Sequence, residues 1–572
     1  MNTIALKLLM GVGITLTTTI SLAADIPDSG RMLRESTPPA MAAPHREQPV
    51  ILVPSEPVRA TPGDSIKFLV TSFVFNGNKA FSTQELNRLM APVFGKELNL
   101  RELEQAVANI THAYVSKGHF LATAIIPPQT IKPNQPIRVD ILEGVLEGIE
   151  LKTSPSETRV PRYLLERYRN RIEAGKPAEE INLIETSMLI NELPALQSRI
   201  VLEPGKELGG TKGTLEVTEG KPYRIQFGAD NYGAYSTGYY RVNSSLELFS
   251  PFRLGDRLTL RGQSSTSGDT QNAGVNWSVP VASYGATIAL DYSWVRYELG
   301  RSFSSLNANG DAHGFNLMFT QPLVRRSYLV LNSFLAGDGK LLDDRIGTPD
   351  NTVNMKRRHL ISGQAGLILS AEDTLLGGGS STFSVSYDGG MVGFDDDAAK
   401  LLDQGVSGLQ TQGNFSKISG GGSRDQVISG DLSLFAQLTG QWSNQNLDSS
   451  EQISLGGASA VRAYPVGEAG ADIGMITSVE LRYLLPTLMN LPGRLQLTGL
   501  FDYGYAELNA QPLPGSSSTI RHLYGAGFGV NWLESDLLTL RTSVSWLLGE
   551  APTSDNTNGG KPTVYFQVGL KY

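Results

Sequence analysis

From Lys221 to Tyr572 the sequence alternates apolar and polar residues, and this alternation constrains the fold more than any other feature. Successive side chains of a β-strand point to opposite faces, so a period of two predicts strands with one apolar face. In the last segment the apolar face carries Val564, Phe566, Val568, Leu570 and Tyr572. We count about sixteen such segments, which begin near residues 222, 238, 256, 271, 284, 311, 326, 356, 380, 413, 429, 473, 494, 522, 537 and 562.

The connections between these segments alternate in length. Those after even-numbered segments are mostly short, such as residues 251–255 and 324–325, whereas several after odd-numbered ones are long, such as 339–355 and 444–472. Short periplasmic turns and long outer loops are typical of outer-membrane β-barrels. The alternative, a soluble all-β protein, would bury its apolar faces against a second sheet, and the sequence implies no second core. Residues 221–572 are therefore predicted to form a transmembrane barrel of about sixteen antiparallel strands, wide enough for a water-filled lumen.

Composition agrees with a membrane barrel and excludes several classes of function. Only 18% of residues are charged and 40% are hydrophobic, as expected when one face of each strand meets lipid. The chain has no cysteine, six scattered histidines, and no HExxH, GxSxG or P-loop motif. We therefore expect no enzyme activity, no metal site and no cofactor. The net charge of −8 argues against a nucleic-acid partner.

The N-terminal residues 1–24 have the pattern of a secretory signal peptide, with Lys7 ahead of an apolar run and small residues at the exit. A membrane anchor is the alternative, although the run is short for a spanning helix. Residues 25–64 hold many prolines, which predicts an extended linker. A short helix is expected around residues 30–36, and whether this segment plugs the barrel is left open.

Residues 65–144 predict a small α+β unit with the order strand, helix, helix, strand, strand, and its first strand is expected over residues 66–75. Ser82 and Glu85 predict a capping box at the start of the first helix. Residues 145–220 repeat the same order of elements. The two units also end alike, with the sequences ILEG and VTEG.

These two units resemble POTRA domains, the periplasmic modules that precede outer-membrane translocation barrels. The resemblance implies a three-stranded sheet with an open edge in each unit. An unfolded client can pair with such an edge through main-chain hydrogen bonds, which tolerate many sequences. The alternative is that the units are rigid spacers. The predicted fold class is thus α+β periplasmic POTRA repeats followed by an all-β transmembrane barrel.

The stretch from Asn446 to Gly474 carries the pattern that is most informative about function. It contains SLGG at residues 454–457 and VRAY at 461–464, and the next segment contains ELRY at 480–483. Together with DNYG at 230–233, these motifs resemble the two-partner secretion transporters of the hemolysin secretion/activation family, whose long loop carries VRGY. The resemblance runs from the first α+β unit to the C-terminus.

In that family the loop folds back into the barrel and its arginine meets the aspartate of an [FG]xDxG motif on the inner wall. The matching residues here are Arg462, Asp502 and Gly504. The alternation around Asp502 independently places its side chain on the polar, lumen-facing side of the strand. A solvated Arg462 is the alternative, and Leu500 stands where the motif has Phe or Gly.

The resemblance therefore implies that residues 444–473 form an inward-folding loop that gates the barrel. The residues expected to latch this loop are Val461, Arg462, Ala463, Tyr464, Asp502 and Gly504. Ala463 replaces the glycine of the family motif, and its effect cannot be derived from the sequence.

The function that the resemblance implies is type V, two-partner secretion across the outer membrane, with the POTRA units in the periplasm. The expected partner is a large, β-helical exoprotein, such as a hemolysin or an adhesin, that is recognised unfolded. Outer-membrane lipid and the barrel-assembly machinery that inserts the chain are further expected partners, and the terminal Tyr572 fits the insertion signal. The alternatives are an insertase of the same superfamily, and a passive porin or barrel enzyme.

Overall fold

The computed structural model describes most of the chain, with short gaps between the described ranges. These ranges are 26–36, 50–52, 67–132, 135–176, 179–207, 209–281, 284–347, 353–406, 408–486, 493–513, 519–533, 537–554 and 561–572. The predicted signal peptide, residues 1–24, lies outside the described residues, as does most of the proline-rich segment. No helix within these ranges is long and apolar enough to cross a membrane.

The first module begins with two short strands instead of the single strand predicted over residues 66–75. The chain divides there because β2 pairs with β4 outside the main sheet, whereas β3 pairs in parallel with β6. The predicted capping box is present, and the Ser82 hydroxyl accepts the Glu85 N–H at 3.3 Å. The elements are β2 (Phe68–Leu69), β3 (Phe73–Asn76), α3 (Thr83–Met90), β4 (Glu97–Leu98), α4 (Leu100–Ser116), β5 (Thr123–Ile125) and β6 (Ile137–Leu142).

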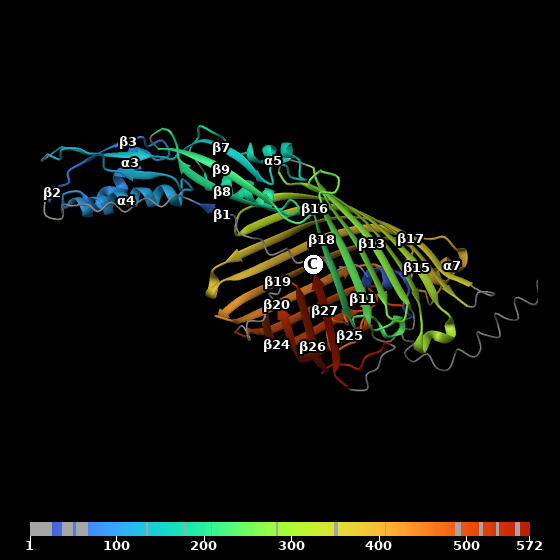
Figure 1. Ribbon diagram of the computed structural model, residues 1–572. Coiled ribbons are helices and arrows are strands. Elements are labelled where there is room, and N and C mark those ends of the chain that lie inside the picture. The colour runs from blue at the N-terminus through green and yellow to red at the C-terminus, as the bar shows by residue number, and fades with distance from the viewer. Residues whose placement is uncertain are drawn as a thin grey trace, which may run out of the picture.

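The second module repeats this topology and gains a strand from the proline-rich segment. Its elements are β7 (Val145–Ser154), α5 (Arg162–Arg169), α6 (Glu180–Asn191), β8 (Leu196–Pro204) and β9 (Gly210–Glu219). The strand β1 (Val50–Leu52) pairs in parallel with β8, so the sheet order is β1-β8-β9-β7. The two modules follow one another in a row on one side of the barrel (Figure 1).

Sixteen antiparallel strands close into a barrel, which confirms the predicted fold class. Each strand begins within three residues of its predicted start. The strands are β10 (Tyr223–Asp230), β11 (Arg241–Phe249), β12 (Arg257–Ser265), β13 (Thr270–Pro280), β14 (Thr287–Glu298), β15 (Asn309–Arg325), β16 (Leu329–Ile346), β17 (Val353–Asp373), β18 (Gly379–Phe394), β19 (Gly413–Ser429), β20 (Leu432–Ser443), β23 (Ile473–Leu484), β24 (Arg494–Glu507), β25 (Ile520–Leu533), β26 (Leu538–Leu547) and β27 (Thr563–Lys571).

Strand length varies strongly around the barrel. The strand β17 has 21 residues and β16 has 18, whereas β10 has 8 and β11 has 9. In Figure 1 the long strands β15 and β17 extend to the end of the barrel that lies farthest from the second module. The barrel closes where Gln226–Asp230 of β10 pairs with Gln567–Lys571 of β27.

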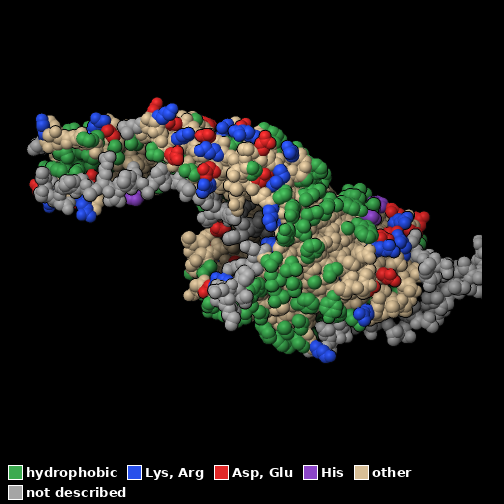
Figure 2. Space-filling view, in the orientation of Figure 1, with side chains coloured by type: hydrophobic (Ala, Val, Ile, Leu, Met, Phe, Trp, Pro, Cys, Tyr) green, Lys and Arg blue, Asp and Glu red, His purple; other side chains and the backbone are tan. Residues whose placement is uncertain are grey.

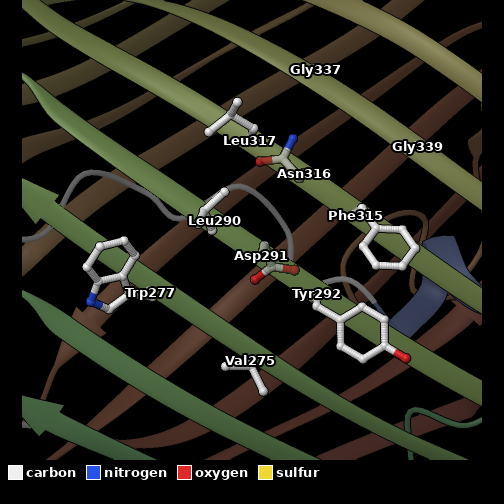
Figure 3. A pocket seen from close by; sticks show the side chains of 10 residues that line it. All are labelled: Val275, Trp277, Leu290, Asp291, Tyr292, Phe315, Asn316, Leu317, Gly337 and Gly339. Carbon is white, nitrogen blue, oxygen red and sulfur yellow. The ribbon is translucent and has the colours of Figure 1, made fainter.

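The outer barrel surface carries the apolar positions of the alternation. Figure 2 shows hydrophobic side chains gathered in a band across the visible barrel face, as lipid contact requires. On β13 to β15 this face includes a shallow hollow next to Gly337 and Gly339 of β16, lined mainly by apolar side chains (Figure 3). The residues that line it are Val275, Trp277, Leu290, Asp291, Tyr292, Phe315, Asn316 and Leu317.

The second module is fixed directly against the inner-end turns of the barrel. Glu185 of α6 accepts a hydrogen bond from Arg326 at 2.7 Å, and Glu192 at the end of the same helix forms an ion pair with Arg325. A Cβ atom at Gly285, in the turn before β14, would lie 2.6 Å from a Leu189 methyl group. The contact therefore combines ion pairs with close packing, and it holds the module below the lumen.

We expect Gly285→Val to loosen this contact. Gly285 has a φ of +80°, so the substitution combines a clash with backbone strain of about 1–2 kcal/mol. Hydrogen exchange of α6 in the detergent-solubilised protein should become faster. The matched control is Gly268→Val, because Gly268 has a φ of +83° but nothing within 4 Å of its Cβ position. Equal exchange of α6 in the two variants would contradict the proposed packing contact.

Candidate functional site inside the barrel

The connection between β20 and β23 lies inside the barrel, with much of its length buried. Within it, Ile453–Ser454 (β21) and Gly470–Ala471 (β22) pair as a short hairpin. The base of the loop is fixed by the buried Asp472, which accepts hydrogen bonds from the N–H groups of Leu447 and Ala510. At the tip, Leu455, Val461 and Tyr464 have no exposed surface. The tip packs against Ala471 of the loop itself and against Ala506 and Leu523 of the inner wall.

The structure brings Arg462 and Asp502 together. Arg462 Nε donates to Asp502 Oδ2 at 2.8 Å and Nη2 donates to Asp502 Oδ1 at 2.7 Å, which is a bidentate ion pair. The backbone N–H of Arg462 adds a third bond at 3.1 Å. The Asp502 residue is only 1% exposed, so the pair is well shielded from water.

Glu480 of β23 is a second carboxylate at this arginine. Its Oε1 accepts a hydrogen bond from Arg462 Nη1, while its Oε2 accepts one from Arg482 Nε at 2.8 Å. Glu480 lies in the ELRY motif at residues 480–483, but it is not among the residues predicted from the sequence to latch the loop. The alternation on β23 could have found it, because Val479 and Leu481 are exposed on the outer face and Glu480 points inward.

Two glycines of the wall make room for the loop tip. A Cβ atom at Gly504 would lie 3.0 Å from both Leu455 and Val461, and one at Gly525 would lie 2.3 Å from the Ala463 methyl group. Ala463 does not have a positive φ, so its backbone conformation does not require the family's glycine. Its methyl group packs where a side chain at position 525 would stand.

Tyr464 holds the tip against the last strands of the barrel. Its hydroxyl donates to the Glu550 carbonyl at 2.7 Å, and its own carbonyl accepts the Tyr565 hydroxyl at 2.9 Å. Leu500, the other departure from the motif, is buried on the inner face of β24 at 6% exposure.

A second ion cluster, which the sequence analysis did not predict, fixes the other half of the loop. Its centre is Arg358 of β17, whose side chain is fully buried. Arg358 donates to Asp448 of the loop, to Asp344 of β16 at 2.6 Å and to Asp28 of the N-terminal segment at 2.8 Å. One arginine thus binds three carboxylates from three separate segments.

The neighbouring Glu451 strengthens this attachment. Lys340 of β16 and Lys417 of β19 both form ion pairs with it. Burial alone would raise the pKa of Glu451, but the two lysine charges outweigh burial and hold this pKa at about 2. Glu451 is therefore ionised at every physiological pH.

The helix α2 (Ser29–Ser36) occupies the lumen beside the loop and appears blue inside the barrel in Figure 1. Its Met32 and Leu33 side chains pack with inward-facing residues of β14, β16 and β17. Arg34 donates two hydrogen bonds of 2.7 Å to loop carbonyls of Ser449 and Gln452. A Cβ atom at Gly30 would lie 2.5 Å from the Ser449 hydroxyl, so helix and loop are in close contact.

The arrangement places two segments, α2 and the loop, across one pore. The loop contacts β16, β17 and β19 through its first half and β23 to β27 through its tip, so it reaches well-separated parts of the wall. Chemically, the site binds these two segments through ion pairs, hydrogen bonds and apolar packing.

Comparison with known families supports this architecture. The family model of the haemolysin secretion/activation protein ShlB/FhaC/HecB matches residues 209–532, more than half of the chain. The model of the POTRA domain, ShlB-type, matches residues 68–144, which form the first module.

Individual proteins agree with the family models. The heme/hemopexin transporter protein HuxB of Haemophilus influenzae is 23% identical over 94% of this chain and 93% of its own length. The outer membrane transporter CdiB of Escherichia coli is 26% identical over 85% of this chain and 80% of its own length. The solved structure of CdiB from Escherichia coli has a TM-score of 0.68 and 22% identity, covering 92% of this chain and 94% of that chain.

The rival prediction of an assembly factor receives weaker support. The structure of BamA from Haemophilus ducreyi lacking POTRA domains 1–3 has a TM-score of 0.52 and 13% identity over 89% of this chain and all of that chain, which indicates a shared fold alone. The family and the transporter relatives support secretion, with the barrel in the outer membrane and the modules in the periplasm. The chain thus belongs to the haemolysin secretion/activation family and is a two-partner secretion transporter.

Proposed function

We propose that this transporter captures one large, unfolded secreted protein in the periplasm and passes it through the lumen in extended form. The two modules make the first contact by strand pairing. The client then replaces α2 and the loop within the barrel and folds outside the cell into a β-helix. Folding on the outer side prevents return and supplies the driving force.

The observation that carries this proposal is the content of the lumen. The pore holds a helix and a loop, and both are attached by side-chain ion pairs and hydrogen bonds as well as by apolar packing. Water that enters when a segment leaves can replace these ion pairs and hydrogen bonds. The residues Val461, Arg462, Ala463, Tyr464, Asp502 and Gly504 form the latch of this gate in our proposal.

Two further partners belong to this proposal. The exposed apolar band of the barrel suits contact with outer-membrane lipid. We also propose that a barrel-assembly machinery inserts the chain into that membrane.

Deletion of the chain in its natural host tests the overall function. We expect the secreted partner to accumulate in the periplasm and to disappear from the medium, while other outer-membrane barrels assemble normally. Fractionation and immunoblotting of both compartments measure this. Continued release of the partner, together with failure of other barrels to assemble, would instead favour the insertase alternative.

Arg462→Ala tests the latch. The substitution leaves Asp502 and Glu480 as buried carboxylates with one fewer cation, a loss of about 3–5 kcal/mol for a buried pair. We expect more frequent large openings in planar lipid bilayers. The control is Arg482→Ala, which removes another cation from Glu480 but leaves the loop attachment intact. Equal conductance in the two variants would show that lumen charge, and not loop attachment, controls opening.

The pKa of Glu451 predicts how the gate responds to pH. Because this pKa is lowered to about 2 from a usual value of about 4.3, the attachment is complete above the usual value. It is lost as the pH falls through about 2. The ratio of the conductance of Glu451→Gln to that of the wild type should therefore exceed one and be the same at pH 8 and at pH 5, roughly. Burial raises the pKa of Asp472, at the base of the loop, to about 6, so both proteins share any change that this group causes. A ratio that falls to one at the lower pH would contradict the proposal.

A further inference from the structure

The second module has an edge strand that is already partly occupied by the chain itself. The strand β8 pairs with β9 along its whole length, from Leu196 to Pro204. On its other side, β1 pairs with only three residues, Arg199 to Val201. The equivalent strand of the first module is β5, and among the described residues no strand pairs with its outer edge. The same edge is thus open in one module and covered in the other.

The pairing of β1 with the edge of β8 is weak because of its geometry. The pairing is parallel and three residues long, and parallel pairing is slightly less stable per residue than antiparallel pairing. Ile51, opposite Ile200, packs only partly buried against the core of this module. Such a short strand can hold the edge while no competitor is present, and a longer strand can replace it.

The occupied edge defines the chemistry of a competitor. On β8 the residues Leu196, Ser198, Ile200 and Leu202 are buried, whereas Gln197, Arg199 and Glu203 are exposed. A segment that pairs with β8 must therefore place apolar side chains at alternate positions, next to Ile200, and polar ones between them. An extended client segment with alternating apolar and polar residues meets this requirement, and it can use the full length of β8.

The same strand is tied to the helix in the pore. The helix α2 ends at Ser36 and β1 begins at Val50, so the residues between them span at most about 50 Å when fully extended. While β1 is paired, it keeps α2 at a high effective concentration near its binding position in the lumen. Release of β1 removes this restraint, and α2 can then leave the barrel farther and for longer.

We propose that β1 is a placeholder on the client-binding edge of the second module, and that an arriving client strand displaces it and thereby frees α2 from the pore. This inference rests on the proposed function, because it assumes that the modules receive an unfolded client. It assigns the receiving edge to β8 and links reception to opening. The first module, with its open edge, receives client segments without such a link.

The test uses the full chain in detergent and in planar bilayers, and it needs no knowledge of the client. The probe is a fluorescent synthetic peptide with the sequence of residues 46–56, a free copy of the β1 segment. Ile51→Asp places a charge against the apolar core and should release β1. We expect this variant to bind the peptide at least about tenfold more tightly than the wild type, because an intramolecular competitor has been removed.

A disulfide that locks β1 onto β8 has the opposite effect to releasing β1, and it can be formed and reduced in one and the same protein. The chain has no cysteine, and Val50 lies opposite Arg199 in the register, so Val50→Cys with Arg199→Cys creates the only disulfide. Oxidation should abolish peptide binding and reduce the frequency of channel opening, and reduction should restore both. Each single cysteine variant is a control, and because oxidised and reduced forms share one folded protein, misfolding does not confuse the result.

Gly30→Leu separates the two halves of the inference. It should displace α2 at its contact with the loop while β1 stays paired, so it should raise conductance without raising peptide binding. If oxidation of the lock changes neither readout, the inference is overturned while secretion by the wild type still supports the proposed function. If the lock blocks peptide binding but leaves conductance unchanged, the link to α2 is overturned. Loss of the proposed function would appear separately, in the deletion experiment.

Discussion

The whole molecule depends on the closure of one backbone hydrogen-bond ladder. A strand in lipid must pair both of its edges, because no water is present to satisfy its N–H and C=O groups. Pairing of β10 with β27 satisfies the last two edges. Closure also fixes which residues point inward, since every strand alternates. The polar residues are thereby gathered in a wet interior where charged side chains can be partly hydrated and can also bind one another.

Two arginines in the barrel interior form such ion pairs. Arg358 and Arg462 each bind more than one carboxylate, and each joins the loop to the wall. Arginine suits this role because its planar group offers five donors and stays charged in nearly any environment. Desolvation of such clusters costs several kcal/mol per ion, so their net contribution to stability is modest. Their value lies in specificity, because each guanidinium donates hydrogen bonds to a defined set of oxygens and so fixes the position of the loop.

The sequence predicted the parts of the structure that local alternation controls. All sixteen barrel strands, the inward direction of Asp502 and the capping box at Ser82 follow from patterns within a few residues. The Arg358 cluster could not be derived in this way, because its partners Asp28 and Asp448 lie 330 and 90 residues away. The strand β1 was not predicted for another reason, because three residues in a proline-rich segment give no periodic signal. Its pairing depends on the edge of β8, which lies far away in the sequence.

The unequal strand lengths give the barrel a slanted outer rim. With about 3.3 Å per residue and a tilt near 40°, a strand as long as β17 rises to about twice the height of an apolar band of about 25 Å. The shortest strands, near the closure, have 8 or 9 residues and fall slightly short of the height of that band. A polypeptide leaving the pore therefore meets a high barrel wall at β16 and β17 and a low one at β10 and β11. On the side of β10 and β11 such a polypeptide clears the wall after a shorter path than on the side of β16 and β17.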